Sequence, residues 1–410
     1  MLDIAAICLV VTALLAYLNH RFVRLPTTIG VMAIALVLSL SLVALDSVGF
    51  GHRIRTADEA FLRSIDFTDV LMRGMLSLLL FAGALHVKLP QLKAYRWQIG
   101  ALAVVGTLAS TVIVGLAMWV VLPFIGVQLE LIYCLLFGAL ISPTDPVAVI
   151  GILKSAGAVD EVEAVITCES LFNDGVGVVV FALLAGVAAS GTVPTFTDGA
   201  LVLLREAGGG LAYGFALGYL TFRMLKSIDQ YQVEVLLTLA AVIGGYALAI
   251  HLEVSGPLAM VVAGVMIGNR GRNDAMSDNT RQYVDMFWEL LDEILNAVLF
   301  VLIGMQVLLL AFPARLLVAA AIAALVTLLA RLLAVGLPVA ALGRVFALPP
   351  GSWRVLTWGG LRGGISVALA LSLPTGAARD VVLFLTYGVV VVSILVQGLT
   401  IGRVIRASKR

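Results

Sequence analysis

Long, uninterrupted apolar runs constrain the fold of this chain more than any other feature of its sequence. A helix needs about 20 apolar residues to cross the hydrocarbon core of a bilayer, and thirteen segments approach that length. They lie near residues 2–19, 27–45, 69–87, 97–121, 128–152, 161–188, 198–222, 231–250, 256–269, 287–311, 314–342, 353–373 and 381–402. The runs are too long, and alternate too little, for membrane β-strands. We therefore predict an all-α polytopic membrane protein with about 13 transmembrane helices.

The composition excludes most soluble classes of protein. Of the 410 residues, 61% are hydrophobic and only 12% are charged, about half the charged share of a soluble domain. The formal net charge of +1 provides no basic field that would attract nucleic acid. Three cysteines without a CxxC pair indicate neither a disulfide framework nor a zinc site. We expect the lipid bilayer as a partner, no nucleic acid, and no cofactor.

Basic residues are distributed unevenly along the chain, and their pattern predicts its orientation. The first span begins with Asp3 and has no basic residue ahead of it, whereas Arg21 and Arg24 follow it, which places the N-terminus outside. If the N-terminus is outside, most of the 26 basic residues fall in inner loops. An odd number of spans then places the C-terminus in the cytoplasm. The predicted location is the cell (inner) membrane.

The number of spans also suggests an internal symmetry. If the seventh span is a linker, the first six and the last six spans can form two repeats. The eighth span comes seven spans after the first, and because seven is odd, the two repeats enter the membrane from opposite sides and are inverted. Inverted repeats are typical of secondary transporters. We treat residues 1–402 as a single transmembrane unit and residues 403–410 as a short cytoplasmic tail.

Five ionisable side chains lie near the middle of predicted spans: Asp145, Glu169, Asp174, Arg331 and Arg362. A charge at that depth is costly and marks a functional site or a buried partner. Arg331 has no acid close to it in sequence, so we expect it to pair across helices, with Glu169 as the first choice. Arg362 is expected to offer its positive charge and hydrogen-bond donors either to freed backbone carbonyls or to Asp145.

The fifth span is interrupted by the string Ser142-Pro143-Thr144-Asp145-Pro146. Pro143 and Pro146 have no N–H to donate and would free carbonyls one turn earlier. Such broken backbone is tolerated at membrane depth only where it lines a cavity or meets protein. The alternative is a plain proline kink, but an aspartate and a threonine at the break favour a binding site.

The sixth span carries two acids and an asparagine within little more than one turn. Ser170 and Asp174 are four residues apart and share a face, and Glu169 and Asn173 form the adjacent stripe. For Glu169, a structural ion pair and a direct role both remain open. For Asp174 we favour a functional role, because this many polar groups exceeds what structure alone requires.

A second candidate break surrounds Arg362 in the twelfth span. Two glycine pairs, which include Gly360 and Gly363, flank this arginine and lower the helix propensity sharply. The break occupies the fifth place in the second repeat, as the proline break does in the first. Corresponding interrupted spans in two halves point to a transport site.

Two further patterns in the sequence are weaker. Gly210, Gly214 and Gly218 are spaced for close helix packing. Asp292 and Asn296, together with Glu293, begin the tenth span. They either line a funnel that leads to the site or are simply hydrated, and we favour hydration.

Three strings, SPTDPVAV (142–149), ESLFNDGVGVV (169–179) and GLRGGISVALALSLP (360–374), resemble those of cation:proton antiporters of the NhaP and eukaryotic sodium/proton exchanger group. The likeness covers essentially the whole chain. It implies the NhaA-like antiporter fold, with two broken helices that cross near the ion site, and alternating access of the elevator type. It also implies a homodimer. Each protomer would have a core domain (spans near 69–188 and 314–402 in part) and a dimerisation domain (spans near 2–45 and 198–269 in part).

The resemblance also implies roles for individual residues. Asp174 matches the aspartate that binds the ion and the proton, and Asn173 matches its partner. Thr144 and Ser170 match oxygen donors to the ion, so that Na⁺ would lie at Asp174, Ser170 and Thr144. Asp145, Glu169, Arg331 and Arg362 match supporting residues of the core. Many relatives carry an acid in the third span, where this sequence has Ala82.

The expected function is electroneutral exchange of one monovalent cation, most simply Na⁺ but also Li⁺ or K⁺, for one proton. Sodium prefers oxygen ligands, and a carboxylate withdrawn from water takes up protons readily, so the two cations compete at Asp174. Two alternatives are a channel or uniporter without proton coupling and a membrane-embedded aspartyl-type hydrolase. No catalytic residues are assigned, because the sequence has no nucleophile or metalloprotease motif, and we do not expect an enzyme.

Overall fold

The computed structural model describes residues 2–47, 70–146, 149–150, 153, 160–191, 199, 201–202, 204–272, 275–307, 313–342 and 347–408, and every regular element within them is helical. The first half comprises α1 (Leu2–Leu18), α2 (Thr27–Ser47), α5 (Leu76–Leu85), α6 (Leu89–Ala94), α7 (Arg96–Ala101), α8 (Thr107–Val121), α9 (Leu131–Ile141) and α11 (Asp160–Ser190). The second half comprises α13 (Gly209–Leu225), α14 (Tyr231–His251), α15 (Gly256–Met266), α17 (Asp278–Gln306), α18 (Ala314–Arg331), α19 (Leu337–Ala341), α21 (Ser352–Trp358), α22 (Gly364–Ser372), α23 (Ala377–Val392) and α24 (Leu399–Ser408).

Tighter or wider helical turns join several of these helices. Seven are π-helical: η1 (Asn19–Val23), η2 (Val70–Met75), η3 (Leu102–Gly106), η5 (Leu204–Gly208), η6 (Ile267–Gly271), η8 (Leu332–Gly336) and η9 (Ser393–Gly398). One, η4 (Leu122–Ile125), is a 3₁₀ turn. Such π turns within otherwise α-helical segments are often found at functional sites.

The all-α membrane class predicted from the sequence is confirmed, and each of the thirteen predicted spans contains helix among the described residues. Six described helices are long and apolar enough to cross a bilayer by length and composition: Ala6–Val23, Arg96–Ile125, Asp160–Ser190, Tyr231–His251, Ala314–Ala341 and Ala377–Ser408. Shorter apolar helices occupy Thr27–Val43, Leu76–Leu85 and Leu131–Ile141. The predicted spans 128–152 and 353–373 do not form single helices, because both are broken in the middle. At the C-terminus, α24 continues through Ser408, so most of the expected tail extends the last helix.

The helix starts follow from local sequence. Ser255 accepts a hydrogen bond from the Leu258 amide at 3.4 Å and caps α15, and Ser277 caps α17 in the same way through Thr280. A side-chain oxygen in this position satisfies one of the free N–H groups at a helix start. The first turn of α11 carries three acids, among them Asp160, which complement the positive end of the helix dipole.

Small residues set how closely the helices pack. Gly210, Gly214 and Gly218 of α13 lie against Ser255, Ala259 and Ala263 of α15, where a Cβ on any of the three glycines would meet the α15 backbone. This confirms the packing role expected for the three glycines. Gly264 of α15 and Gly268 of the following turn η6 lie against α5. Close packing of this kind holds α5, α13 and α15 together as one group.

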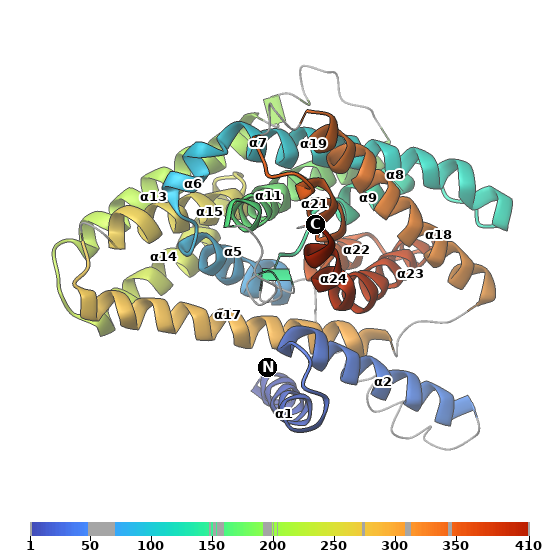
Figure 1. Ribbon diagram of the computed structural model, residues 1–410, viewed down its shortest axis with the longest axis horizontal. Helices are drawn as coiled ribbons and strands as arrows, with labels where there is room; N and C mark the ends of the chain where they lie inside the picture. Colours follow the sequence, from blue (N-terminus) through green and yellow to red (C-terminus); the bar gives the residue numbers. More distant parts are fainter. Residues whose placement is uncertain are drawn as a thin grey trace.

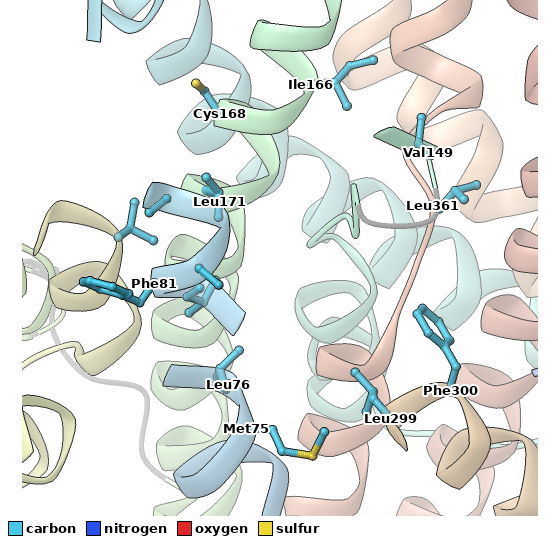
Figure 2. Close-up of a cluster of buried hydrophobic side chains, with 14 of the residues drawn as sticks. Met75, Leu76, Phe81, Val149, Ile166, Cys168, Leu171, Leu299, Phe300 and Leu361 are labelled. Carbon is cyan, nitrogen blue, oxygen red and sulfur yellow. The ribbon is translucent and has the colours of Figure 1, made fainter. Parts of the chain in front are cut away.

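The helices form two groups with α11 between them. Figure 1 shows α13, α14 and α15 on the left of the molecule and α8, α9, α18 and α23 on the right. A hydrophobic cluster within the right-hand group is built from α8, α9, α18, α22 and α23. The larger hydrophobic cluster spans the boundary between the groups. Figure 2 shows part of it, including Phe81 of α5, Leu171 of α11 and Leu299 of α17.

Candidate functional site

Two interrupted spans cross beside α11, and their crossing forms the centre of the site. The helix α9 ends at Ile141, directly before the Ser142–Pro146 string. In the second half of the chain, α21 ends at Trp358 and α22 starts only at Gly364. The two extended stretches meet where the amide of Asp145 donates a 2.8 Å hydrogen bond to the carbonyl of Leu361. Both breaks predicted from proline and glycine are therefore present, and they cross.

Arg362 holds the two breaks together. Its guanidinium donates to the carbonyl oxygens of Ser142 and Pro143, the latter at 2.8 Å from Nη1, and the side chain is only 2% exposed. The carbonyl of Ser142 lacks a helical donor because Pro146, four residues later, has no N–H, and the carbonyl of Pro143 lies in the break itself. A buried arginine with several donors satisfies them and places a positive charge at the crossing. This is one of the two arrangements that the sequence left open for Arg362.

Asn173 ties α11 to the first break. Its Oδ1 accepts a hydrogen bond from the Thr144 amide at 3.2 Å, and its Nδ2 donates to Thr144 Oγ1 at 2.8 Å and to Glu169 Oε1 at 3.1 Å. The hydroxyls of Thr144 and Ser170 lie 2.9 Å apart. Because Asn173 is fully buried, this network fixes the break relative to α11.

Glu169 forms a buried bidentate ion pair. Arg331 Nη1 lies 2.6 Å from Glu169 Oε1, and Arg331 Nη2 lies 2.6 Å from Oε2. Arg331 Nε donates to the carbonyl of Leu356 at 3.2 Å, just before the second break. The structure thus pairs Arg331 with the expected glutamate. The pair links α11 to α18 and to the end of α21, and it leaves Glu169 without a free oxygen for an ion.

Asp174 faces a cavity. The side chain is 6% exposed, and it lines a cavity of about 410 Å³ together with Thr144 and Asp145. Pro143 and Pro146 line the same cavity, as does Gly363. Ser170 lies one helical turn before Asp174. It does not itself line the cavity, but its hydroxyl contacts the hydroxyl of Thr144, which does. The group contains a carboxylate and two hydroxyls, and such oxygen atoms suit a hard monovalent cation.

Acidic side chains of α17 form the outer part of this cavity. Glu289 and Glu293 are exposed, Asp292 is half-buried, and Asn296 is buried, and all four line the cavity. Exposed His86, which follows α5, lines the cavity as well. Our preference for simple hydration of Asp292, Glu293 and Asn296 was wrong, because α17 runs alongside the site rather than away from it.

Glycines at the crossing allow the close approach of its parts. A Cβ on Gly177 of α11 would overlap the ring of Pro143, and a Cβ on Gly363 would overlap the carboxylate of Asp145. A Cβ on Gly360 would come within 2.7 Å of Arg331 Nε. The glycines of the second break therefore do more than weaken a helix, because they leave space for two of the five charged side chains.

Sequence reasoning missed two supporting residues in the last span. The hydroxyl of Ser393 accepts a 2.9 Å hydrogen bond from the amide of Arg362, and Gln397 Nε2 donates to the carbonyl of Trp358 at 3.3 Å. Both lie in the π turn η9. The two polar residues are four apart in an apolar run and therefore share a face. This spacing could have indicated a polar contact with another helix. A serine in a membrane helix often bonds only its own backbone, however, so the spacing alone does not identify such a contact.

Comparison with known proteins places this architecture in a family. Residues 10–407 match the family described as "Sodium/hydrogen exchanger, transmembrane". The chain belongs to this family. It is 54% identical over 410 residues to the Na(+)/H(+) antiporter NhaP of Pseudomonas aeruginosa, covering 99% of this chain and 96% of that protein.

More distant members of the family agree with this assignment. The Na(+)/H(+) antiporter NhaH of Halobacillus dabanensis is 33% identical, covering 94% of this chain and 93% of the relative. The fold matches the solved structure of the sodium proton antiporter MjNhaP1 from Methanocaldococcus jannaschii at pH 8, with a TM-score of 0.75 and 19% identity. That match covers 98% of this chain and 97% of the other. The antiporter fold expected from the three motifs is thereby confirmed.

Proposed function

We propose that this protein is a secondary antiporter of the cell membrane that exchanges one Na⁺ for one H⁺. The observation that carries the proposal is the placement of Asp174, buried at the crossing of two broken helices yet open to a cavity. Relatives named as Na(+)/H(+) antiporters, up to 54% identical over nearly the full chain, support the same activity. We propose a transporter and not an enzyme, with no cofactor beyond the transported ions.

The charges at the crossing favour strict one-for-one coupling. Asp145, Glu169 and Asp174 bring three negative charges, and Arg331 and Arg362 bring two positive ones, which leaves one negative charge. Either one Na⁺ or one H⁺ bound at Asp174 neutralises the group. An empty, ionised site would carry an unpaired charge through a dry barrier, which is strongly unfavourable. Only the loaded states cross, so each turnover exchanges one cation for one proton.

Thr144 and Ser170 complete the proposed ion site. Their hydroxyls are hydrogen-bonded to each other at 2.9 Å beside the cavity. Thr144 Oγ1 also accepts a hydrogen bond from Asn173 Nδ2, so when its own proton is donated to Ser170, one of its two lone pairs stays free for a cation. Na⁺ would therefore be held by the carboxylate of Asp174 and by these two oxygens, with water from the cavity. Asn173, Asp145, Glu169, Arg331 and Arg362 hold this geometry rather than bind the ion.

The two helix groups suggest which parts move. We propose that the core consists of α7–α11 and α18–α24, since the crossing and its ion pair join these helices. The dimerisation domain would contain α1, α2 and α13–α15. From its sequence position, α5 was expected in the core, but its tight packing on Gly264 and Gly268 favours movement with α15. Alternating access would then carry the core past this scaffold within a homodimer.

The proposed orientation has the N-terminus outside and the C-terminus in the cytoplasm. In that orientation α17 begins at the inner surface, and the acidic side chains Glu289 and Glu293 lie on the cytoplasmic side of Asp174. The cavity of this conformation would then open to the cytoplasm. An acidic mouth concentrates cations near the site.

Transport in proteoliposomes tests the proposal. A pH-sensitive dye inside the vesicles should dequench on addition of Na⁺, with Li⁺ and K⁺ measured in parallel at several pH values. A membrane potential set by valinomycin and K⁺ gradients should leave the rate and end point of Na⁺-driven exchange unchanged. A strong dependence on voltage would refute one-for-one coupling. Unitary currents without proton movement would instead identify a channel or uniporter, and peptide cleavage would identify a hydrolase.

A further inference from the structure

A second cavity lies at the turn between α1 and α2, outside the ion site. It is lined by Asn19, His20, Arg21, Arg24, Leu25 and Thr27, with a small apolar contribution from α1. Three of these six side chains are basic types, and none of the described residues that line the cavity is acidic. We refer to this space as the basic turn cavity.

The turn that forms the cavity is held in one conformation by Asn19. This side chain is 3% exposed, its Nδ2 donates to the carbonyl of Leu25 at 2.9 Å, and its Oδ1 accepts from the Leu25 amide at 3.3 Å. Gly30 of α2 leaves the space that Asn19 occupies. Arg24 adopts a left-handed backbone with φ of 58°, and its amide donates to the carbonyl of Asn19 at 2.6 Å. Such a locked turn presents its basic side chains in a defined arrangement.

The two arginines have no compensating acid in the part of the chain that the structure describes. The described ion pairs involve Arg205, Arg272 and Arg331, and both Arg21 and Arg24 are exposed. Within the described residues, the Arg21 guanidinium interacts with the ring of Phe22, whose centroid lies 5.8 Å away. Two unpaired guanidiniums facing one cavity repel each other, and a phosphate between them would accept hydrogen bonds from both.

The surroundings of the cavity are those of a membrane boundary. The apolar helix Ala6–Val23 ends here, and its last turns expose Tyr17, Phe22 and Val23, with Phe22 70% exposed. Aromatic and basic side chains together at the end of a span fit the level of lipid headgroups. The chemistry that this site recognises is therefore a phosphate that carries apolar chains.

We propose that the basic turn cavity binds the phosphate headgroup of an anionic phospholipid, whose acyl chains lie along the exposed apolar face of α1. A dissolved phosphate ion shares the headgroup chemistry but would not need the apolar rim formed by Tyr17, Phe22 and Val23. The site is distinct from the ion site, because none of its basic residues lines the cavity that contains Asp174.

The bound lipid would also act on transport, an extension that depends on the function proposed above. Thr27 lines both cavities, and the neighbouring Pro26 and Thr28 line the ion cavity. Arg21 and Arg24 therefore stand behind a wall of the cation pathway, where their unneutralised charges repel an approaching Na⁺. A phosphate between them removes that repulsion and lowers the KM for Na⁺.

Native mass spectrometry of the detergent-solubilised protein tests the binding. Wild-type protein incubated with equal amounts of phosphatidylglycerol and phosphatidylcholine should retain the anionic lipid with roughly tenfold preference. The variant Arg21→Gln/Arg24→Asn should lose that preference, asparagine being chosen because it tolerates a left-handed backbone. The matched control Arg403→Gln/Arg406→Gln removes two exposed arginines of α24 from the same predicted face and should keep the preference.

Three outcomes would overturn the proposed site. They are equal retention of the two lipids by wild-type protein, unchanged preference in the Arg21→Gln/Arg24→Asn variant, and displacement of phosphatidylglycerol by millimolar inorganic phosphate. The last outcome would identify a site for a free anion. Because mass spectrometry measures binding alone, these results do not depend on whether the protein exchanges Na⁺ for H⁺.

Proteoliposomes test the consequence for transport. Wild-type KM for Na⁺ should fall about two- to fivefold when phosphatidylglycerol is added to phosphatidylcholine vesicles. General surface charge also attracts Na⁺, so the comparison with the control variant is decisive. The Arg403→Gln/Arg406→Gln protein should respond as wild type does, whereas Arg21→Gln/Arg24→Asn should have a low KM in neutral vesicles and a smaller response. An equal response in both variants would refute the coupling.

Discussion

Asp174 differs from the other acids at the crossing in what surrounds its carboxylate. Glu169 is held by both terminal nitrogens of Arg331, whereas Asp174 has Asp145, Glu169 and Arg362 as its charged neighbours. It also lines the cavity, which supplies a route for ions and water. A carboxylate with an excess of negative neighbours and access to solvent is suited to bind and release cations in turn.

Replacement of Asp174 by asparagine should reduce Na⁺-driven proton movement in proteoliposomes to the level of protein-free vesicles. The amide keeps the shape of the side chain but cannot take up a proton or neutralise Na⁺. Size-exclusion elution of the variant should match that of wild type, because the carboxylate is not part of the Asn173 network. Transport by Asp174→Asn at a normal rate would show that another group carries the ions.

Removal of one partner from the Glu169–Arg331 pair should destabilise the fold. Glu169→Gln leaves a buried guanidinium without its counter-charge, a change that costs about 3–5 kcal/mol. The midpoint of thermal unfolding in detergent should therefore fall clearly below that of wild type. The double variant Glu169→Gln/Arg331→Met should recover part of the loss, since no buried charge is left unpaired. A single variant as stable as wild type would contradict the structural role of this pair.

At the scale of elements, the site depends on how closely α11 approaches the two breaks. Gly177 of α11 lies against Pro143 of the first break. The second break is supported from η9 by Ser393 and Gln397. The π turn widens the last span locally, where its polar side chains serve the backbone of the second break. Helix contacts thus position the crossing, whereas the charged residues supply its chemistry.

Gly177→Ala should disturb the contact between α11 and the first break. The added methyl would overlap the Pro143 ring, and overpacking of this kind costs roughly 1–3 kcal/mol. We expect lower thermal stability together with slower exchange, because the break that carries Thr144 must shift. Gly186→Ala on the same helix has open space around the added methyl and serves as the control. Equal effects of the two substitutions would show that only helix propensity is being measured.

Ser393→Ala should remove the acceptor of the Arg362 amide. A buried N–H left without a partner costs about 1–3 kcal/mol, and here the loss falls on the residue that holds both breaks. We expect a lower unfolding midpoint and a reduced maximal exchange rate. Thr386→Val in the same span removes a buried hydroxyl that bonds only its own helix at Val382, and it should be nearly neutral. The idea fails if both variants behave alike.

At the scale of the whole molecule, one cavity contains both Asp174 and the acidic side chains of α17. Two of its residues, Glu289 and Glu293, lie near the middle of α17. The exposed ion pair of Arg205 with Glu253, at 2.6 Å, is predicted to lie on the opposite membrane face. These two positions therefore provide markers for the two sides of the membrane.

Cysteine labelling with a membrane-impermeant maleimide should show which side the cavity opens to. In a background in which Cys8, Cys134 and Cys168 are replaced by alanine, Glu293→Cys should react in inside-out vesicles and stay unlabelled in right-side-out vesicles. Glu253→Cys should give the opposite result. Labelling of Glu293→Cys from the outside would invert the proposed topology and the direction in which the cavity opens.

Much of the fold and part of the site could be predicted from the sequence, because the signals are local. The apolar runs require helices whatever their neighbours are, since a backbone in lipid must satisfy its own hydrogen bonds. Pro143 and Pro146 break a helix by their own geometry, and the cluster from Glu169 to Asp174 shares a helix face by its spacing. These features depend only on residues within a few positions of one another.

Local sequence is sufficient to predict the class of this protein, its two breaks and the candidate acids, whereas the packing of distant helices determines which of these residues act together. Arg331 is 162 positions from Glu169, and the role of Ser393 follows from a bond to Arg362 on another helix. The cavity combines side chains of α5, α11 and α17 with both breaks. Such sets arise from helix packing, and packing depends on shape and contact between distant segments, for which no local pattern exists.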